Sequence, residues 1–394
     1  MRIQVTRKVE IPDPYKLALY RKAPELGPRI LFFSGGTALR STSRKLIRST
    51  HNTVHLITPF DSGGSSAILR KAFAMPAVGD IRNRLMALAD QSVQGNPAIF
   101  DLFAYRLPKN LGQEKLRAEL DQMADGRHKL VRRIPDPMRK IIRNHFHQFL
   151  EAMPRDFDLR GASIGNLVLT AGYLTNRRQL DPVIYIFSKL VQVCGTVRPT
   201  INKDLHLAVR LEDGSVIVGQ HNITGKETAP LASPISDIWL TGGLESDAPV
   251  AASIRNKVRE RIAGADLICY PPGSFYSSVV ANLLPGGVGE AVAANPCPKV
   301  FVPGTGRDPE AVGLSVADRA ALLRRYLTES GAPEGADILG YVIVDSRNGS
   351  YPGGIDRAEL DRMGLTVIDC ELVTSGSAPD LDERLLSEML LSLA

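Results

Sequence analysis

The chain has 394 residues, of which 44% are hydrophobic and 23% are charged, the composition of an ordinary soluble enzyme of about two or three domains, or of one large α/β unit with an insertion. Its net charge of +6 fits either nucleic acids or anionic small molecules as partners. No run approaches the ~20 apolar residues of a membrane span and the first ten residues lack the apolar core of a secretory signal, so a membrane span is excluded and we expect a cytoplasmic protein.

The first elements are units of strand, glycine turn and helix. Residues 29–49 show a short apolar strand, a Gly-Gly-Thr turn and a helix, and residues 53–58 form a second strand before the turn 63–66 opens another helix. Units repeated at this spacing are typical of parallel strands with helices packed on the faces of the sheet.

A helical stretch follows. Residues 91–160 carry helical periodicity and no strand-like run, which predicts a helical insertion, either a lid or an oligomer contact. The domain boundaries expected are therefore 1–90 for the first part of the α/β domain, 91–160 for the insertion and 161–394 for the remainder.

The remainder begins with two buried helices, at 164–176 and 180–194. Residues 206–223 alternate between apolar and polar positions on both sides of an Asp-Gly turn, which predicts a β-hairpin. The segment 266–278 reads as strand, glycine turn and helix, and 299–306 as another strand with a glycine turn.

Two late strands, at 341–346 and 366–372, and an amphipathic helix at 381–394 complete the pattern. Together the elements predict an α/β fold with a mostly parallel sheet, a hairpin and a helical insertion.

Three glycine turns carry the strongest functional signal: 34–37, 63–66 and 272–274. Glycine lets the backbone approach a ligand closely, and the N–H groups at the start of a helix favour a phosphate. None of the turns matches the GxGxxG or GxxxxGK[ST] pattern, and each alone fits a tight turn without a ligand equally well. Their common position at the carboxyl ends of parallel strands predicts a ligand site there.

Two carboxylates lie beside these turns. Asp61 ends a strand and Asp80 lies at the start of a helix, so the pair could share a Mg²⁺ ion with phosphate oxygens. The alternative is that Asp80 only caps its helix and Asp61 only forms a turn. The histidines are interpreted as structural or exposed, and the absence of GxSxG argues against a hydrolytic triad.

The remaining signals are weaker. The basic run 127–143 is interrupted by prolines and has no zinc-finger spacing, so a solvated face or the lip over an anionic ligand is favoured over nucleic-acid binding. The four cysteines lie far apart without a CxxC motif. They predict buried, reduced thiols rather than a zinc site or a disulfide framework.

Six blocks of sequence resemble one family. They are GGT at 35–37, ITPFDSGGSSAILRK at 57–71, PAVGDIRNRLMALAD at 76–90, SIGNLVL at 163–169, LEDGSVIVGQHNI at 211–223 and PPGSFYSSVVANLL at 271–284. In this order they resemble the 2-phospho-L-lactate transferase superfamily, and more closely its bacterial gluconeogenesis-factor branch. The resemblance covers most of 29–305.

The resemblance implies a Rossmann-like three-layer α/β sandwich that binds a nucleotide diphosphate in the strand-end crevice. The transferase branch moves a phospholactyl group from a guanosine-diphosphate donor to a deazaflavin precursor with a divalent metal. The gluconeogenesis-factor branch is associated with UDP-sugar binding. The family also makes a homodimer the expected assembly.

The predicted site combines this resemblance with the glycine turns. Asp61 and Asp80 are the predicted catalytic and metal-binding residues, with Mg²⁺ as the expected ion. The predicted ligand-binding residues are Gly35, Gly36, Thr37, Gly63, Gly64, Ser65, Arg82, Asn83, Asn166, Gly273, Ser274 and Ser277. For the last of these, the resemblance places either Ser277 or Ser278 near the phosphate.

The sequence departs from the family pattern at four places. Ala38 replaces a glycine after GGT, and Ser62 replaces the second of two adjacent aspartates. The segment 161–166 lacks a histidine and an asparagine, and VPGTGRDPE at 302–310 replaces an Asn-Leu-Met-Thr-Gln-type stretch. We therefore expect a retained diphosphate site with an altered ligand. Two functions stay open: a metal-dependent transferase, or a non-catalytic sensor of a UDP-sugar or dinucleotide.

Overall fold

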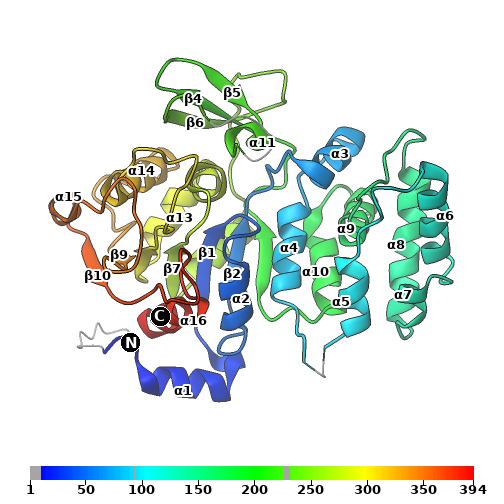
Figure 1. Ribbon diagram of the computed structural model, residues 1–394, viewed down its shortest axis with the longest axis horizontal. Helices are drawn as coiled ribbons and strands as arrows, with labels where there is room; N and C mark the ends of the chain where they lie inside the picture. Colours follow the sequence, from blue (N-terminus) through cyan, green and yellow to red (C-terminus); the bar gives the residue numbers. More distant parts are fainter. Residues whose placement is uncertain (1–9, 93–94, 226–230) are drawn as a thin grey trace.

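The computed structural model describes residues 10–92, 95–225 and 231–394. Its central element is a parallel sheet of seven strands in the order β10-β9-β8-β7-β1-β2-β3 (Figure 1). The strands are β1 (Ile30–Ser34), β2 (Val54–Ile57), β3 (Thr196–Pro199), β7 (Leu267–Tyr270), β8 (Lys299–Phe301), β9 (Tyr341–Val344) and β10 (Thr366–Asp369). The chain builds outward from β1 to β3 and then returns to the other side of β1, so the strand order reverses between β1 and β7.

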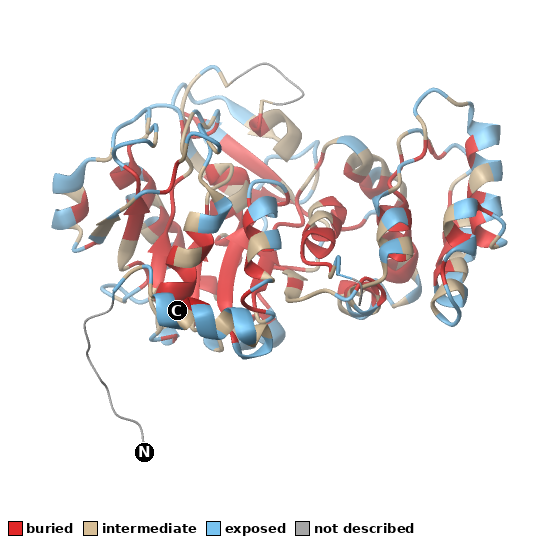
Figure 2. Cartoon of the chain, turned by 60° about the horizontal axis from the view of Figure 1, so that its bottom comes forward, coloured by how far each residue is buried: buried red, intermediate tan, exposed pale blue. Residues whose placement is uncertain are grey.

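The sequence of β1 explains the layers on either side of the sheet. All five residues of ILFFS are buried, as expected for a parallel strand covered on both faces. Ile30 and Phe32 point into one cluster of apolar side chains, and Leu31 and Phe33 point into another. The expected three-layer α/β fold is thereby confirmed (Figure 2).

Helices cover both faces. The cluster that contains Phe32 also holds apolar side chains of α1 (Pro14–Lys22), α2 (Arg40–Leu46) and α16 (Glu383–Leu393). The opposite cluster holds those of α12 (Asn256–Ala263), α13 (Val288–Ala294), α14 (Val316–Glu329) and α15 (Arg357–Arg362).

A helical segment is inserted between β2 and β3, and we call it the helical segment α3–α10. It comprises α3 (Gly64–Phe73), α4 (Gly79–Ala87), α5 (Pro97–Ala104), α6 (Gln113–Ala124), α7 (Lys129–Arg132), α8 (Met138–Ala152), α9 (Ile164–Thr175) and α10 (Leu180–Leu190). It has its own apolar core around α9, whose first ten residues are all buried. The sequence predicted helices over 91–160 and two buried helices at 164–176 and 180–194. The boundaries 91–160 for a separate inserted domain stay a prediction.

A second, antiparallel sheet of order β5-β4-β6 lies near the carboxyl ends of β1 and β2 (Figure 1). Its strands are β4 (His206–Leu211), β5 (Val216–Val218) and β6 (Ile235–Thr241), and α11 (Gln220–Ile223) follows β5 directly. The predicted hairpin is confirmed over β4 and β5, which pair antiparallel around Gly214, whose φ of 85° suits glycine. The prediction of strand was wrong for 220–223, which form α11. The strands β3 and β6 were not predicted.

Three further features bear on the predictions: the segment after β7, the cysteines and the length of the helices. The segment after β7 forms one π-helical turn, Phe275–Val279, and then a 3₁₀ turn, Val280–Asn282, rather than an α-helix. All four cysteines are free, but only Cys269 is fully buried. None of the described helices is long and apolar enough to cross a membrane.

Candidate functional site

A cavity of about 480 Å³ opens at the carboxyl ends of β1, β2 and β7, beside the point where the strand order reverses. The three predicted glycine turns follow these three adjacent strands and all contribute to its wall. Of the predicted site residues, the cavity is lined by Gly35, Gly36, Thr37, Asp61, Gly63, Gly64, Ser65, Asp80, Arg82, Asn83, Asn166, Gly273 and Ser274.

Two side chains, Ser278 and Asp80, pack closely against the backbone of the first turn, 34–37. A Cβ atom on Gly35 would lie 2.5 Å from Ser278 Oγ, and one on Gly36 would overlap the carboxylate of Asp80. Any larger residue at either position would therefore have to displace Ser278 or Asp80, and Asp80 lies directly against the backbone of the turn.

A buried arginine, Arg84, holds the same turn through hydrogen bonds to its backbone carbonyls. Arg84 donates from Nη2 to the carbonyl of Gly35 at 3.0 Å and from Nη1 to the carbonyl of Leu39 at 2.9 Å and to Ser43 Oγ. Burial lowers the pKa of Arg84 to about 10, which leaves it protonated at neutral pH. Arg84 thus ties α4 to the turn that joins β1 and α2.

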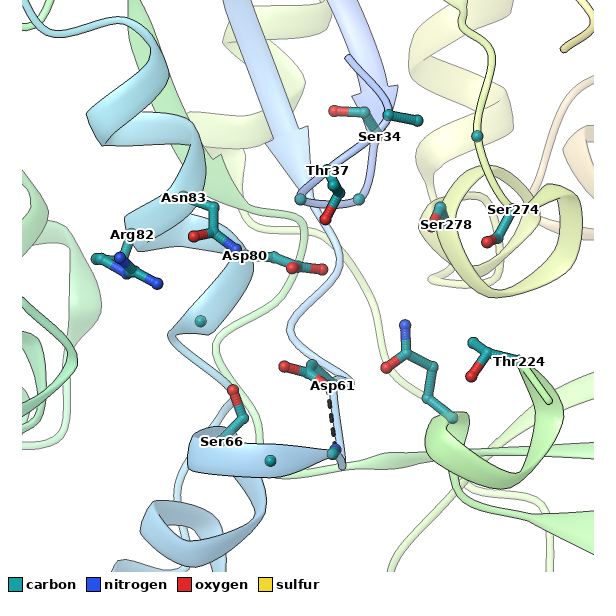
Figure 3. A pocket seen from close by; sticks show the side chains of 18 of the residues that line it. Ser34, Thr37, Asp61, Ser66, Asp80, Arg82, Asn83, Thr224, Ser274 and Ser278 are labelled. Atoms are coloured by element: carbon teal, nitrogen blue, oxygen red, sulfur yellow. Dashed lines mark hydrogen bonds between the residues drawn. The ribbon is translucent and has the colours of Figure 1, made fainter. Parts of the chain in front are cut away.

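The two carboxylates, Asp61 and Asp80, project into the cavity (Figure 3). Asp61 Oδ1 accepts a hydrogen bond from the backbone N–H of Gly63 at 3.1 Å, so its turn-forming role is real. A Cβ atom on Gly79, the neighbour of Asp80, would lie 3.2 Å from Asp61 Oδ2. The N-cap of α4 is Val78, so Asp80 lies inside the first turn of that helix and not at its cap.

Asp61 and Asp80 could bind a divalent cation only if a bound phosphate ligand supplied further oxygen atoms. Among the described residues, no group of three or more His, Cys, Asp or Glu side chains is placed to hold a metal ion. Mg²⁺ commonly takes one or two carboxylates, phosphate oxygens and waters. Asp61 and Asp80 supply the carboxylates in such a set, and the bound phosphates would have to supply the rest.

Several buried polar atoms in the cavity wall have no hydrogen-bond partner among the described residues. Arg82 is 8% exposed and Asn166 is 1% exposed, yet Arg82 Nε and Asn166 Oδ1 are both unpaired. Ser34 Oγ is a third such atom. Buried polar groups are almost always paired, so these three atoms mark a part of the cavity wall whose hydrogen-bonding capacity is not used within the protein.

One predicted residue lies elsewhere. Ser277 does not line the cavity: its Oγ donates to Glu310 Oε1 at 2.6 Å and its N–H donates to Glu310 Oε2 at 2.7 Å. Its neighbour Ser278 lines the cavity instead (Figure 3). Burial and the adjacent Asp308 raise the pKa of Glu310 to about 7.

The structure adds lining residues that the sequence did not single out. Arg106 comes from the loop between α5 and α6, and Gln220, His221 and Thr224 come from α11 and its end. His221, interpreted from sequence as structural or exposed, lies 2.8 Å through Nδ1 from Ser62 Oγ. In the sequence, only the position of 220–223 at the end of the family block 211–223 indicated that these residues could belong to the site.

The basic run 127–143 spans α7 and the start of α8 and contributes no lining residue.

The sheet order and this cavity define an α/β protein with a ligand crevice where the strand order reverses. The chain belongs to the 2-phospho-L-lactate transferase family, because the family model "2-phospho-L-lactate transferase CofD" matches residues 30–373. The resemblance found in the sequence is confirmed.

Relatives support this assignment. The chain is 28% identical over 361 residues to the gluconeogenesis factor of Bacillus subtilis, covering 88% of this chain and 92% of that protein. It is 27% identical over 354 residues to a putative gluconeogenesis factor of a Nostoc species, of which it spans 63%. A crystal structure of a UPF0052 family protein from Bacillus halodurans has the same fold, with a TM-score of 0.68, 24% identity, and coverage of 93% of this chain and 99% of that one.

Proposed function

We propose that the cavity binds a nucleotide-activated donor through its diphosphate, and that the protein transfers a phosphorylated group from this donor to an acceptor. The observation that carries the proposal is the convergence of three glycine turns on Asp61 and Asp80, next to a buried arginine with an unpaired Nε. Family membership supports a transferase, and the backbone N–H groups of the turns suit phosphate oxygens.

Each group has a role in this reaction. The turns at Gly36, Gly64 and Gly273 would hold the diphosphate, while Asp61 and Asp80 would hold a divalent cation. Such a cation stabilises the charge that develops on the phosphates during transfer. The acceptor hydroxyl attacks the outer phosphorus and passes its proton to the carboxylate of Asp80. The anhydride P–O bond breaks, and a nucleoside monophosphate leaves with the bonding electron pair.

The second candidate function is a non-catalytic sensor of a UDP-sugar or dinucleotide. Its support is Ser62, where the family pattern has an aspartate. The Ser62 hydroxyl is engaged with the His221 ring at 2.8 Å and also accepts from the His221 N–H at 3.2 Å. A side chain held in this way provides no second carboxylate for a metal. The curated relatives carry the name gluconeogenesis factor, which fits a role in carbon metabolism.

A binding screen followed by one variant tests the proposal. Thermal unfolding is first measured with UDP-sugars, GDP, GTP, NAD and phosphate, each with and without Mg²⁺. Release of nucleoside monophosphate from the best donor is then followed in the presence of candidate acceptors. We expect Asp80→Asn to lower turnover at least a hundredfold, because the variant loses both the proton acceptor and one carboxylate of the metal pair, and to change the metal-free affinity less than threefold.

The control is Asp101→Asn, at an exposed aspartate of α5 that does not line the cavity. It should behave as wild type. Mg²⁺-independent binding without any turnover would support the sensor, and unchanged turnover in Asp80→Asn would contradict the transferase. If none of the nucleotides shifts the unfolding midpoint, the cavity is not a nucleotide site.

A further inference from the structure

A second cavity, of about 570 Å³, opens at the carboxyl end of β3, the edge strand of the parallel sheet. Three stretches of chain line it: 179–182 at the start of α10, 198–203 at the end of β3 and beyond it, and Ser253 with 255–258 at the start of α12. None of these residues lines the cavity at β1, β2 and β7, which we call the first cavity. The volume of the second cavity is typical of sites that bind small molecules.

Buried, hydrogen-bonded side chains separate the two cavities. Thr200, which lines the second cavity, donates through Oγ1 to Asn282 Oδ1. Asn282 in turn donates through Nδ2 to the carbonyl of Ser278 at 2.8 Å and to that of Ser34 at 3.2 Å, and both of these serines line the first cavity. Thr200 is 1% exposed and Asn282 is fully buried. The second cavity is therefore a separate site and not an extension of the first.

The second cavity carries an excess of positive charge. Four cationic side chains line it, Arg198, Lys203, Arg255 and Lys257, and Asp181 is its one carboxylate among the described residues. Charge of one sign that lines a concave surface concentrates ions of the opposite sign there. The lining therefore favours an anion.

The single carboxylate is already shared by two of the cations. Asp181 Oδ1 lies 2.6 Å from Arg198 Nη1, and Asp181 Oδ2 lies 3.5 Å from Lys257 Nζ. The Arg198 side chain is 18% exposed, so this guanidinium is part of the cavity wall and is not free in solvent. Asp181 holds Arg198 in place and leaves Lys203 and Arg255 without a carboxylate.

These two remaining cations come from opposite sides of the cavity. Arg255 Nη1 donates to the neutral side-chain oxygen of Gln179 at 2.6 Å, which links the start of α12 to the start of α10. Lys203 is exposed and forms no ion pair with the described part of the chain. Arginine binds phosphate oxygens through its planar fork and lysine binds them as a point charge, so the two together suit a phosphate group.

We propose that the second cavity binds a phosphorylated small molecule with two or more negative charges, held by Arg198, Lys203 and Arg255. Four cations and one carboxylate leave three positive charges, so a ligand with two phosphate groups offsets more of them than a single phosphate does. The second cavity shares no lining residue with the first, so this site does not depend on the proposed function.

Three anions and one double variant test the second cavity. Isothermal titration compares inorganic phosphate, pyrophosphate and citrate on wild type and on Lys203→Gln/Arg255→Gln. Wild type should bind pyrophosphate at least tenfold more tightly than phosphate, and more tightly than citrate. The double variant should bind pyrophosphate at least tenfold more weakly than wild type. Both side chains are exposed, so the variant is expected to fold, which its unfolding midpoint checks.

The control is Lys115→Gln/Arg117→Gln, which removes the same charge from two exposed positions of α6 outside both cavities. It should keep the pyrophosphate affinity within twofold of wild type. Pyrophosphate bound in the first cavity would be insensitive to Lys203→Gln/Arg255→Gln, because neither residue lines that cavity.

Three results would overturn the second site: no binding of pyrophosphate to wild type, equal affinity in wild type and Lys203→Gln/Arg255→Gln, or an equal loss in the control, which would assign the attraction to net charge alone. Tighter binding of citrate than of pyrophosphate would overturn the assignment to a phosphate. Failure of every nucleotide to bind the first cavity would contradict the proposed function and leave the second site standing.

Discussion

At the scale of single residues, the cavity depends on close approach between side chains and glycine backbone. Asp80 and Ser278 lie so near the first turn that a side chain at position 35 or 36 would have to displace one of them. The sequence could predict the glycines and Asp80, because each sits at a strand end or helix start. It could not decide between Ser277 and Ser278, of which Ser278 lines the cavity, since that choice depends on the π-helical turn.

The substitution Gly36→Ala tests this close approach. The added methyl group would overlap the Asp80 carboxylate, so either the turn or Asp80 must move. We expect at least a tenfold loss of nucleotide affinity in the presence of Mg²⁺, and a decrease of about 1–3 kcal/mol in the free energy of unfolding from overpacking. Isothermal titration and urea unfolding measure the two quantities.

The control is Gly112→Ala, at the N-cap of α6, where φ is −70° and no atom lies within 4 Å of the added carbon. It should leave ligand affinity unchanged. Wild-type affinity in Gly36→Ala would show that the position of Asp80 against the turn does not matter for binding.

At the scale of elements, the π-helical turn Phe275–Val279 is held by two acids. Asp308 Oδ2 accepts from the N–H of Phe275 at 2.8 Å, and Glu310 accepts twice from Ser277. Both acids lie in the segment 302–310, in which this sequence departs from the family pattern. Asp308 and Glu310 accept hydrogen bonds from N–H groups at the start of this turn, which lies next to the cavity-lining residues Ser274 and Ser278.

The raised pKa of Glu310 makes this element sensitive to pH. Its pKa in the folded protein is about 7, against the ordinary glutamate value of 4.5, chiefly because of burial and then because of Asp308. The folded state therefore binds this proton more tightly than the unfolded state. The associated stability is fully present below pH 4.5 and is lost as the pH rises through 7.

The substitution Glu310→Gln removes this titration. Urea unfolding at pH 5 and pH 8 should show that wild type loses on the order of 2 kcal/mol more than the variant over this interval. Glu329→Gln, on an exposed and ion-paired glutamate of α14, should keep the wild-type pH dependence. The same pH dependence in Glu310→Gln as in wild type would show that the buried carboxyl does not titrate in this range.

The elements themselves were predictable where a strong local pattern existed. Apolar runs gave β1 and β2, and the Asp-Gly turn gave the hairpin of β4 and β5. β3 was missed because it is four residues long and alternates in burial at the sheet edge, and β6 was missed because Asp237 interrupts its apolar run. Short edge strands owe their pairing to neighbours far away in the sequence.

At the scale of the whole molecule, the cavity joins parts that are distant in the chain. The parallel sheet supplies the glycine turns, the helical segment α3–α10 supplies Arg106 and Asn166, and α11 beside the antiparallel sheet supplies His221. The α/β class could be predicted from the repeated strand, turn and helix units. That Arg106 lines the same cavity as Arg82 could not be predicted, because it depends on how the helical segment α3–α10 packs. A homodimer stays a prediction.

A ligand that bridges these parts should protect all of them at once. Hydrogen exchange is measured with and without a nucleotide sugar at about 100 times its dissociation constant, which adds roughly 2.7 kcal/mol of stability. We expect slower exchange in three separate segments, 35–40, 162–166 and 219–224, because all three contribute residues to or adjoin the cavity wall. Gly36→Ala, with its weakened site, should show little protection at the same ligand concentration. Protection confined to 35–40 would mean that the ligand touches the sheet alone, and that the helical segment and α11 take no part in binding.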